Sequence, residues 1–212
     1  MTVQGPVAII GAGRMGRGLS LALQEAGIEA ALLGRTRRPQ DTLSTTLVLI
    51  AVPDESIGMV AEDLARGRTV GERHVVLHLS GLLDRGALDP LGDTGAALGS
   101  FHPLQSIADP STARARLRGA CAGLEGDDRA LDAGERLARA LGMHPVRLAP
   151  GVKPAYHAGA VIASNYVVVL ASLAEGLAQK AGIPPAEARG LPAPARRGVG
   201  ARWPHHRGGP AR

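Results

Sequence analysis

A short apolar strand followed by three spaced glycines constrains the fold of this chain more than any other feature. Residues 6–10 (PVAII) are apolar and β-prone, and residues 14–26 carry apolar or small side chains at helical intervals. Between them Gly11 permits a tight turn, Gly13 lets a ligand approach the backbone, and Gly16 lets helix and strand pack closely. This context predicts a dinucleotide site with the pyrophosphate on the helix N-terminus. The cofactor contacts expected here are Gly11, Gly13, Arg14, Met15 and Gly16.

The rest of the pattern alternates strands with helices. The run 47–52 (LVLIAV) is continuously apolar, which is typical of a strand buried on both faces of a parallel sheet. The alternation predicts an α/β fold, a Rossmann-type doubly wound, mostly parallel sheet. From Pro154 one long helix without a partner strand is expected to residue 181. The other expected strands are 28–33, 75–79, 96–101 and 145–148, and the other expected helices are 55–66 and 128–141.

These patterns divide the chain into three parts. Residues 1–150 are expected to form the dinucleotide-binding domain, and residues 151–186 a separate helical part. Residues 187–212 are rich in Pro, Gly, Arg and Ala, and this composition predicts disorder. We hypothesise that this tail derives from out-of-frame reading of a GC-rich gene. The twelve residues 35–46 hold only a loop, so the sheet is expected to be one strand short or abbreviated there.

Charge and composition exclude several classes of protein. The net charge of +5 resides in residues 189–212, which hold six arginines and no acidic residue, and nucleic-acid binding is therefore not expected. The sequence contains no run of about 18 apolar residues, so no membrane span is expected. The N-terminus has no basic segment typical of a signal peptide, so none is expected. The single Cys121 is interpreted as a small buried hydrophobe, and no metal site is expected. Together these features favour a cytoplasmic protein.

The residues after the second strand favour one cofactor over another. An NAD site usually has Asp or Glu there, accepting hydrogen bonds from the ribose 2′-hydroxyl. This chain has Gly34 followed by Arg35, Thr36 and Arg37, and guanidinium groups can bind a 2′-phosphate through paired hydrogen bonds. The sequence therefore predicts NADP(H), with NAD(H) less favoured, although the arginines could also be a solvated loop.

Polar residues also follow the other strands, where ligands bind in open α/β sheets. Val52 and Pro53 are expected to line the cofactor groove, and Ser80 and His102 to face nicotinamide and substrate. Asp54 could line the groove or cap the next helix. His78 lies inside its strand and is expected to be packed or hydrogen-bonded in the core.

The helix from Pro154 is expected to form the other wall of the site. At 100° per residue Lys153, His157 and Ser164 share one stripe, with Asn165 beside it. Lys153 or His157 could act as general acid in hydride transfer, and Ser164 and Asn165 could hold the polar end of the substrate. Alternatively these residues satisfy backbone groups at an interdomain interface. Tyr156 is interpreted as a packing residue.

Several strings together carry a family resemblance: AVPDESI (51–57), HLSG (78–81), GSFHPLQS (99–106) and KPAYHAGAVIASNY (153–166). Over residues 5–186 the chain resembles Rossmann-like oxidoreductases whose C-terminal half is the domain of unknown function 2520. That family is similar to pyrroline-5-carboxylate reductases and, more distantly, to 6-phosphogluconate dehydrogenases. The resemblance implies a dinucleotide-dependent oxidoreductase that forms a dimer through an all-helical C-terminal domain. It also implies that residues 151–186 are the first helix of a truncated helical substrate or dimerisation domain.

The leading hypothesis is an NADP(H)-dependent oxidoreductase that transfers hydride to or from a small carbonyl or imine substrate. Its expected partners are that small molecule and a second copy of the chain. Two alternatives remain open at this stage: an NADP(H)-binding sensor without catalysis, and an inactive fragment of such an oxidoreductase.

Overall fold

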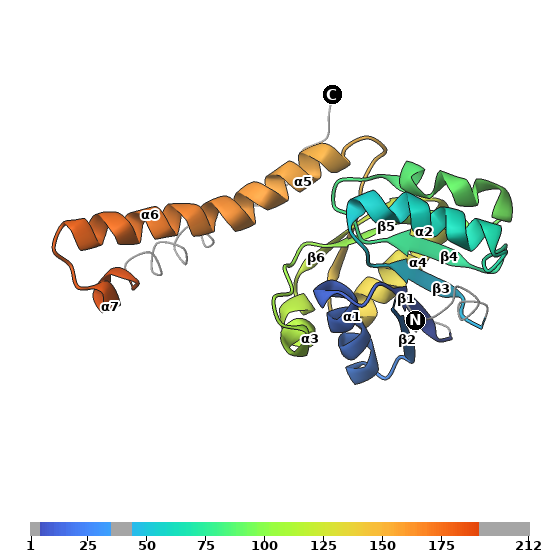
Figure 1. The fold of residues 1–212 in the computed structure, drawn as a ribbon, viewed down its shortest axis with the longest axis horizontal. Coiled ribbons are helices and arrows are strands. Elements are labelled where there is room, and N and C mark those ends of the chain that lie inside the picture. Colours follow the sequence, from blue (N-terminus) through green and yellow to red (C-terminus); the bar gives the residue numbers. More distant parts are fainter. Residues whose placement is uncertain (1–4, 35–43, 191–212) are drawn as a thin grey trace, which may run out of the picture. The chain divides into compact units, whose positions relative to one another are not determined.

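The computed structural model describes residues 5–34 and 44–190, apart from the side chains of Ser164 and Asn165 (Figure 1). By its internal contacts the chain divides into two units, Met1–His157 and Ala158–Arg212. The connecting segment expected as a loop and the expected disordered tail therefore fall mostly outside the described residues.

The first unit is built on one seven-stranded sheet in the order β2-β1-β3-β4-β5-β6-β7. Neighbouring strands are parallel except β5 and β6, which pair antiparallel. The predicted α/β fold with a mostly parallel sheet is thus confirmed. The strands are β1 Val7–Ile10, β2 Ala30–Leu33, β3 Leu47–Ile50, β4 Val75–His78, β5 Ala97–Pro103, β6 Cys121–Gly126 and β7 His144–Arg147.

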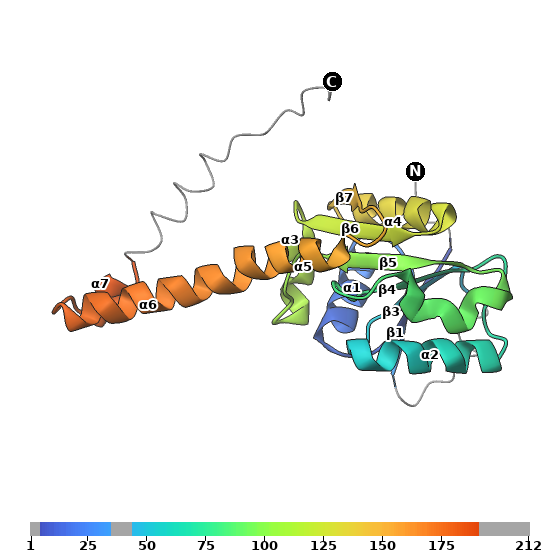
Figure 2. The ribbon, with the colours of Figure 1, turned by 90° about the horizontal axis from the view of Figure 1, so that it is seen from above.

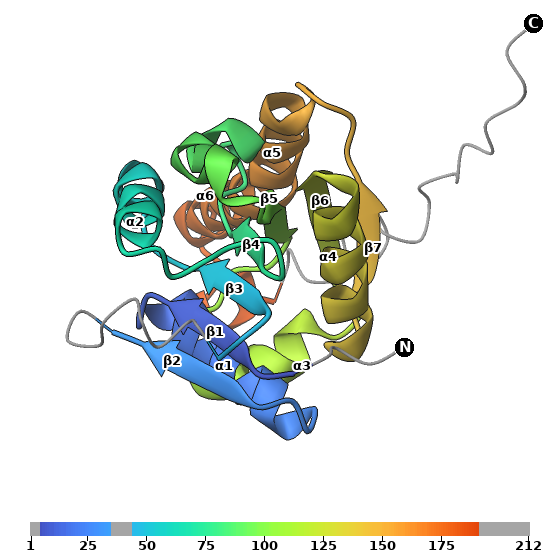
Figure 3. The same ribbon diagram turned by 90° about the vertical axis from the view of Figure 1, so that its right-hand side faces the viewer.

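Helices cover both faces of this sheet, as Figures 2 and 3 show. Because successive strand residues point to opposite faces, Val7 and Ile9 pack on one side and Ala8 on the other. The first side is covered by α1 Arg14–Glu25, α3 Ala113–Leu117 and α4 Asp128–Ala140, and the second by α2 Asp54–Arg66 and the 3₁₀ helix η2 Arg85–Thr94. A further 3₁₀ turn, η3 Pro110–Thr112, precedes α3. Both faces of the central strands are buried, which accounts for their unbroken apolar runs.

Strand β6 and several short helices, among them η2 and α3, were not expected from the sequence. Strand β6 (CAGLEG) contains two glycines and a glutamate, so it gives neither an apolar run nor an alternation. Its place is set by close backbone approach to β5: a Cβ at Gly99 would lie 2.6 Å from the Glu125 carbonyl oxygen. The 3₁₀ helix η2 contains Pro90 and two glycines, which obscure any helical period.

Strand β2 is an edge strand of the described sheet, and a short connection follows it. Pairing places β2 beside β1 alone, and the described ranges 5–34 and 44–190 hold no strand beyond it. The usual Rossmann order continues past this point with a third strand. Within the described residues the sheet thus ends at β2, and most of the connection that carries the prediction lies outside them.

The prediction of one uninterrupted helix over 154–181 is wrong in one respect. Helix α5 Lys153–Val161 passes into a π-helical stretch, Ile162–Tyr166, before α6 Val167–Lys180. A π turn bonds residue i to i+5, so the 100° spacing that grouped Ser164 with Lys153 does not hold through it. A short helix, α7 Pro185–Ala188, ends the described part and reaches into the first residues of the expected tail.

Candidate active site

The site candidates of the first unit follow the carboxyl ends of four neighbouring strands. Strands β1, β3, β4 and β5 are parallel neighbours, so their carboxyl ends lie along one edge of the sheet. The glycine turn follows β1, Val52 and Pro53 follow β3, and Ser80 follows β4. His102 lies near the end of β5. This edge is where open α/β sheets bind their ligands.

The glycine turn has the geometry that the cofactor motif requires. Gly11 has φ +118°, and a Cβ there would overlap the carbonyl oxygen of Ala51. A Cβ at Gly16 would overlap the carbonyl oxygen of Gly11, so this glycine permits the close contact between helix and turn. A Cβ at Gly13 would meet no protein atom within 4 Å. Gly13 therefore leaves open the space through which a pyrophosphate would reach the backbone.

The N-terminus of α1 is suited to an anion. Gly13 is its N-cap, no side chain caps its N–H groups, and its first turn holds no acidic residue. Free N–H groups and the helix dipole favour negative charge there. The residues present thus fit the pyrophosphate of a dinucleotide.

A groove of about 720 Å³ opens beside this turn. Of the predicted cofactor contacts, Gly11, Gly13, Val52 and Pro53 line it, whereas Arg14, Met15, Gly16 and Ser80 do not. Arg35, Thr36 and Arg37, which carry the prediction of NADP(H), lie outside the described residues. The described lining is completed by Ile10, Ala12, Leu33, Gly34, Ala51, Val60, Asp63 and Leu64.

Ser80 connects the ends of β3 and β4. Its hydroxyl donates to Asp54 Oδ2 at 2.8 Å and accepts from the backbone N–H groups of Leu82 (3.1 Å) and Leu83 (2.9 Å). Asp54 is the first residue of α2, whose N-cap is Pro53, and it makes no capping bond. The interpretation of Asp54 as a helix cap is therefore wrong, because its carboxylate accepts the Ser80 hydroxyl instead.

Lys153 is the most buried charged side chain of the site. Its side chain is packed out of solvent, with 1% of the residue exposed, and Nζ donates to the Ser80 carbonyl oxygen at 2.9 Å. Burial lowers the pKa of Lys153 to about 8, against the opposing effect of the carboxylates of Glu125, Asp84 and Asp54. A lysine with this pKa can give up a proton near neutral pH.

Two histidines flank Gly81, the residue after Ser80. The ring centroids of His102 and His157 lie 5.7 Å apart, and a Cβ on Gly81 would overlap His157 and lie 2.7 Å from His102 Nε2. Burial, with nearby His157 and Lys153, lowers the pKa of His102 to about 4, so this imidazole is neutral at pH 7. Within the described ranges, Nδ1 of His102 and of His157 are buried and make no hydrogen bond.

Tyr156 and His78 have the packing roles that the sequence predicted for them. The ring of Tyr156 packs edge-on against His102, with centroids 5.8 Å apart. His78 is fully buried in β4, and its Nε2 lies 2.9 Å from the Asp84 carbonyl oxygen. Burial, aided by Lys153, lowers the pKa of His78 to about 4. His78 thus lies in the core next to the site, and the partly buried Tyr156 packs beside it.

The structure brings together only part of the predicted catalytic set. Lys153, His102 and His157 all lie in the first unit. Ser164 and Asn165 fall in the π-helical stretch of the second unit, with undescribed side chains. Sequence reasoning missed the packing of Gly81, and also Glu125, which lies near Lys153 and whose side chain accepts the N–H of Arg85 at 2.8 Å. The HLSG string pointed to Gly81, but no signal marked Glu125, because β6 itself was not expected.

Two further kinds of site find no support in the part of the chain that is described. Its His, Cys, Asp and Glu side chains form no group of three or more that could hold a metal ion. Among the described helices, none has the length and apolarity needed to cross a bilayer.

Two family models match separate ranges of the chain. Residues 3–103 match the Rossmann-like domain, and residues 120–194 match the domain of unknown function DUF2520. No curated protein matches the chain in sequence.

Solved structures resemble the fold over most of the chain. An imine reductase of Streptomyces aurantiacus is 18% identical, with a TM-score of 0.72 over 92% of this chain and 74% of its own. A pyrroline-5-carboxylate reductase of Coxiella burnetii is 17% identical, with a TM-score of 0.67 over 92% and 78%. A Plasmodium falciparum pyrroline carboxylate reductase with NADP bound is 11% identical, with a TM-score of 0.68 over 93% and 78%. At these identities the likeness is one of fold.

Proposed function

We propose that this chain, a Rossmann-like domain joined to a DUF2520 domain, is an NADP(H)-dependent oxidoreductase acting on a small carbonyl or imine compound. One observation carries the proposal. The buried amine of Lys153, held by the Ser80 carbonyl, lies at the same sheet edge as the glycine turn and its groove. The fold shared with imine and pyrroline carboxylate reductases supports the same reaction type.

The chain's own residues supply binding, orientation and a proton. The N-terminus of α1 binds the pyrophosphate, and the arginines after β2 bind the 2′-phosphate that distinguishes NADP(H). When bound, the cofactor supplies or accepts hydride at the substrate carbon. As that carbon is reduced, the ammonium of Lys153 donates a proton to the substrate oxygen or nitrogen, which leaves the Lys153 side chain as a neutral amine.

His102 and His157 are placed to orient the substrate. Each has a buried Nδ1 that no described group satisfies, and burying such an atom without a partner costs roughly 1–3 kcal/mol. Hydrogen bonds to the polar end of a substrate would remove this cost. We assign binding of the substrate to these two imidazoles, with Ser164 and Asn165 as further candidates from the second unit.

A substrate screen tests this function. Purified protein is incubated with NADPH and a panel of small ketones, aldehydes and cyclic imines, and loss of the reduced nicotinamide is followed by absorbance. Turnover of at least one compound, abolished in Lys153→Met, supports the proposal. NADPH binding without turnover of any compound would favour the sensor alternative.

The second unit favours assembly with another copy of the chain. Its helices expose large apolar side chains, with Leu170 65% and Leu177 68% exposed. A helix that is apolar on several sides is normally buried. The exposed set is Ile162, Tyr166, Val167, Val168, Val169, Leu170, Leu173 and Leu177. We propose that a homodimer, in the cytoplasm, covers this surface.

Sedimentation distinguishes a dimer from a monomer. Wild type is expected to sediment as a dimer and Leu170→Asp as a monomer, because a buried carboxylate would oppose association. Gln179→Glu, a charge change on the exposed side of α6, is the matched control and should remain dimeric. A wild-type monomer would contradict the dimer.

A further inference from the structure

A second cavity lies at the opposite edge of the sheet from the candidate active site. It has a volume of about 260 Å³ and is bordered by Leu47 and Val75, the first residues of β3 and β4. These positions mark the amino ends of the strands, whereas the cofactor groove follows the carboxyl ends. The cavity therefore takes no part in the reaction proposed above. Thr46, Arg73, Arg129, Asp132, Ala133 and Arg136 complete the described lining.

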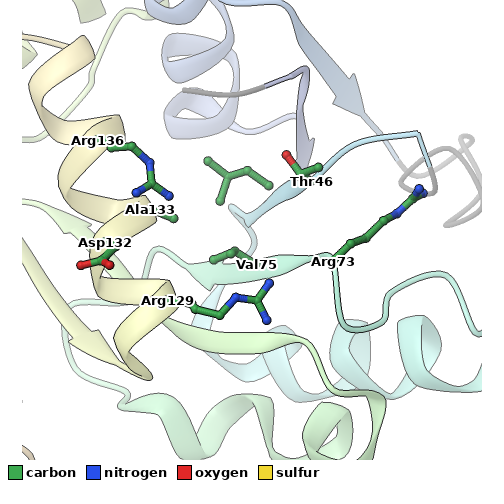
Figure 4. A pocket seen from close by; sticks show the side chains of 8 residues that line it. Thr46, Arg73, Val75, Arg129, Asp132, Ala133 and Arg136 are labelled. Atoms are coloured by element: carbon green, nitrogen blue, oxygen red, sulfur yellow. The ribbon is translucent and has the colours of Figure 1, made fainter. Parts of the chain in front are cut away.

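Two arginines of α4 direct positive charge into this cavity. Arg129 and Arg136 are seven residues apart, which is two helical turns, so they lie on one face of the helix. Figure 4 shows both guanidinium groups turned to the cavity, while the side chain of Arg73 points away from it. Arg129 is anchored by a 2.7 Å hydrogen bond to the Glu72 carbonyl oxygen, and the described residues take up none of its other guanidinium N–H groups.

Asp132 and Glu135, the two acidic residues between Arg129 and Arg136 on α4, are paired with arginines that do not line the cavity. Asp132 binds Arg147 at 2.8 Å and its carboxylate is turned away from the cavity in Figure 4. Glu135 binds Arg147 at 2.6 Å and Arg139 at 3.2 Å. In the described part of the chain no carboxylate pairs with Arg73, Arg129 or Arg136. Among residues 5–34 and 44–190, the positive charge of these arginines is thus not balanced by an ion pair.

We infer that this cavity is a binding site for a phosphate group, held between Arg129 and Arg136. Guanidinium groups bind phosphate oxygens through paired, charge-assisted hydrogen bonds. The volume is below the range of roughly 300–1,000 Å³ of most organic ligand sites, so it favours a small oxyanion over a nucleotide. The phosphate is either free inorganic phosphate or the terminal group of a phosphomonoester.

Calorimetric titration of the full chain with inorganic phosphate at fixed ionic strength tests this inference. Wild type should bind phosphate saturably, and Arg129→Gln and Arg136→Gln should each weaken binding by about tenfold or more, since each removes charge-assisted bonds. Arg139→Gln is the matched control. It removes the same charge from the same helix, but Arg139 binds Glu135 instead of lining the cavity, so it should keep wild-type affinity.

The variants also separate this site from the cofactor groove, which can itself attract phosphate. Binding that survives in Arg136→Gln would place the ion elsewhere and overturn the inference, as would no binding to wild type or an equal loss in all three variants. NADPH affinity should be unchanged in Arg136→Gln, so the result does not depend on the proposed enzyme activity. Repeating the titration with O-phosphoserine distinguishes the two sources: tighter binding than inorganic phosphate indicates a phosphomonoester, and weaker binding the free ion.

Discussion

The amine of Lys153 donates a 2.9 Å hydrogen bond to the backbone carbonyl oxygen of Ser80. That carbonyl is itself held in place, because the Ser80 hydroxyl bonds both Asp54 and the backbone of the next loop. The chain thereby fixes a buried ammonium at the carboxyl ends of its central strands.

Replacing Lys153 removes the proposed proton donor. Lys153→Met should lower kcat by roughly 10²–10⁴-fold, the usual contribution of a general acid. NADPH affinity should change little, since Lys153 does not line the groove. Steady-state kinetics and a binding titration on the same preparation check both. Unchanged kcat would exclude Lys153 as the acid.

The pH dependence of reduction should report the same group. Because the pKa of Lys153 is lowered to about 8 and the ammonium is the active form, kcat/KM should be constant below about pH 8 and fall above it. Heteronuclear NMR of the lysine side chains measures this pKa without a substrate. A resonance titrating near 8 should be present in wild type and missing from Lys153→Met; titration of every lysine above 10 would contradict the assignment.

Two glycines of the cofactor turn should respond differently to a methyl group. Gly13→Ala places its Cβ in space free of protein atoms, so the thermal midpoint should stay near wild type while NADPH affinity falls. Gly16→Ala would drive its Cβ into the Gly11 carbonyl and should lower stability as well. Calorimetry and thermal unfolding separate the two effects. Undiminished NADPH affinity in Gly13→Ala would contradict the placement of the pyrophosphate.

The absence of a side chain at Gly81 should be necessary for the positions of His102 and His157. Its Cβ would overlap His157 and lie 2.7 Å from His102, so Gly81→Ala should displace the imidazoles and reduce turnover at least tenfold with NADPH still bound. Gly92→Ala is the control, because a Cβ there meets no atom within 4 Å. Equal kinetics for both variants would show that the histidines do not act on the substrate.

Acid should destabilise the first unit through its buried histidines. The pKa values of His78 and His102 are lowered to about 4 from 6.5, so between these values the unfolded chain binds protons that the folded chain does not. Stability from this source is therefore full above about pH 6.5 and is lost toward pH 4, by about 3 kcal/mol for His78. Urea unfolding from pH 7 to 4.5 should show a shallower loss in His78→Asn. Parallel curves for both proteins would contradict this origin.

Local patterns in the sequence predicted most of the first unit. The continuous apolar strands and the helices at 3.6-residue spacing lie within a few residues of their expected bounds, because burial on both sheet faces leaves a direct mark on composition. Strand β6 left no such mark, since its position depends on backbone contact with β5 across the sheet.

The site was predictable to the extent that it follows strand ends. Ser80 and His102 were found in this way, and Lys153 from the polar stripe of its helix. The bond between Asp54 and Ser80 joins residues 26 positions apart and depends on how β3 and β4 align, so no local pattern predicts it. The π-helical stretch likewise arises from hydrogen bonding that side-chain periodicity does not report.

Titration of the purified chain with NADPH and NADH, followed by nicotinamide fluorescence, tests whether the glycine turn binds a dinucleotide. We expect saturable binding of both, with NADPH clearly tighter and this preference lost when Arg35 and Arg37 are both replaced by glutamine. Absence of binding by either cofactor, in protein that unfolds cooperatively, would contradict the assignment of the glycine turn as a dinucleotide site.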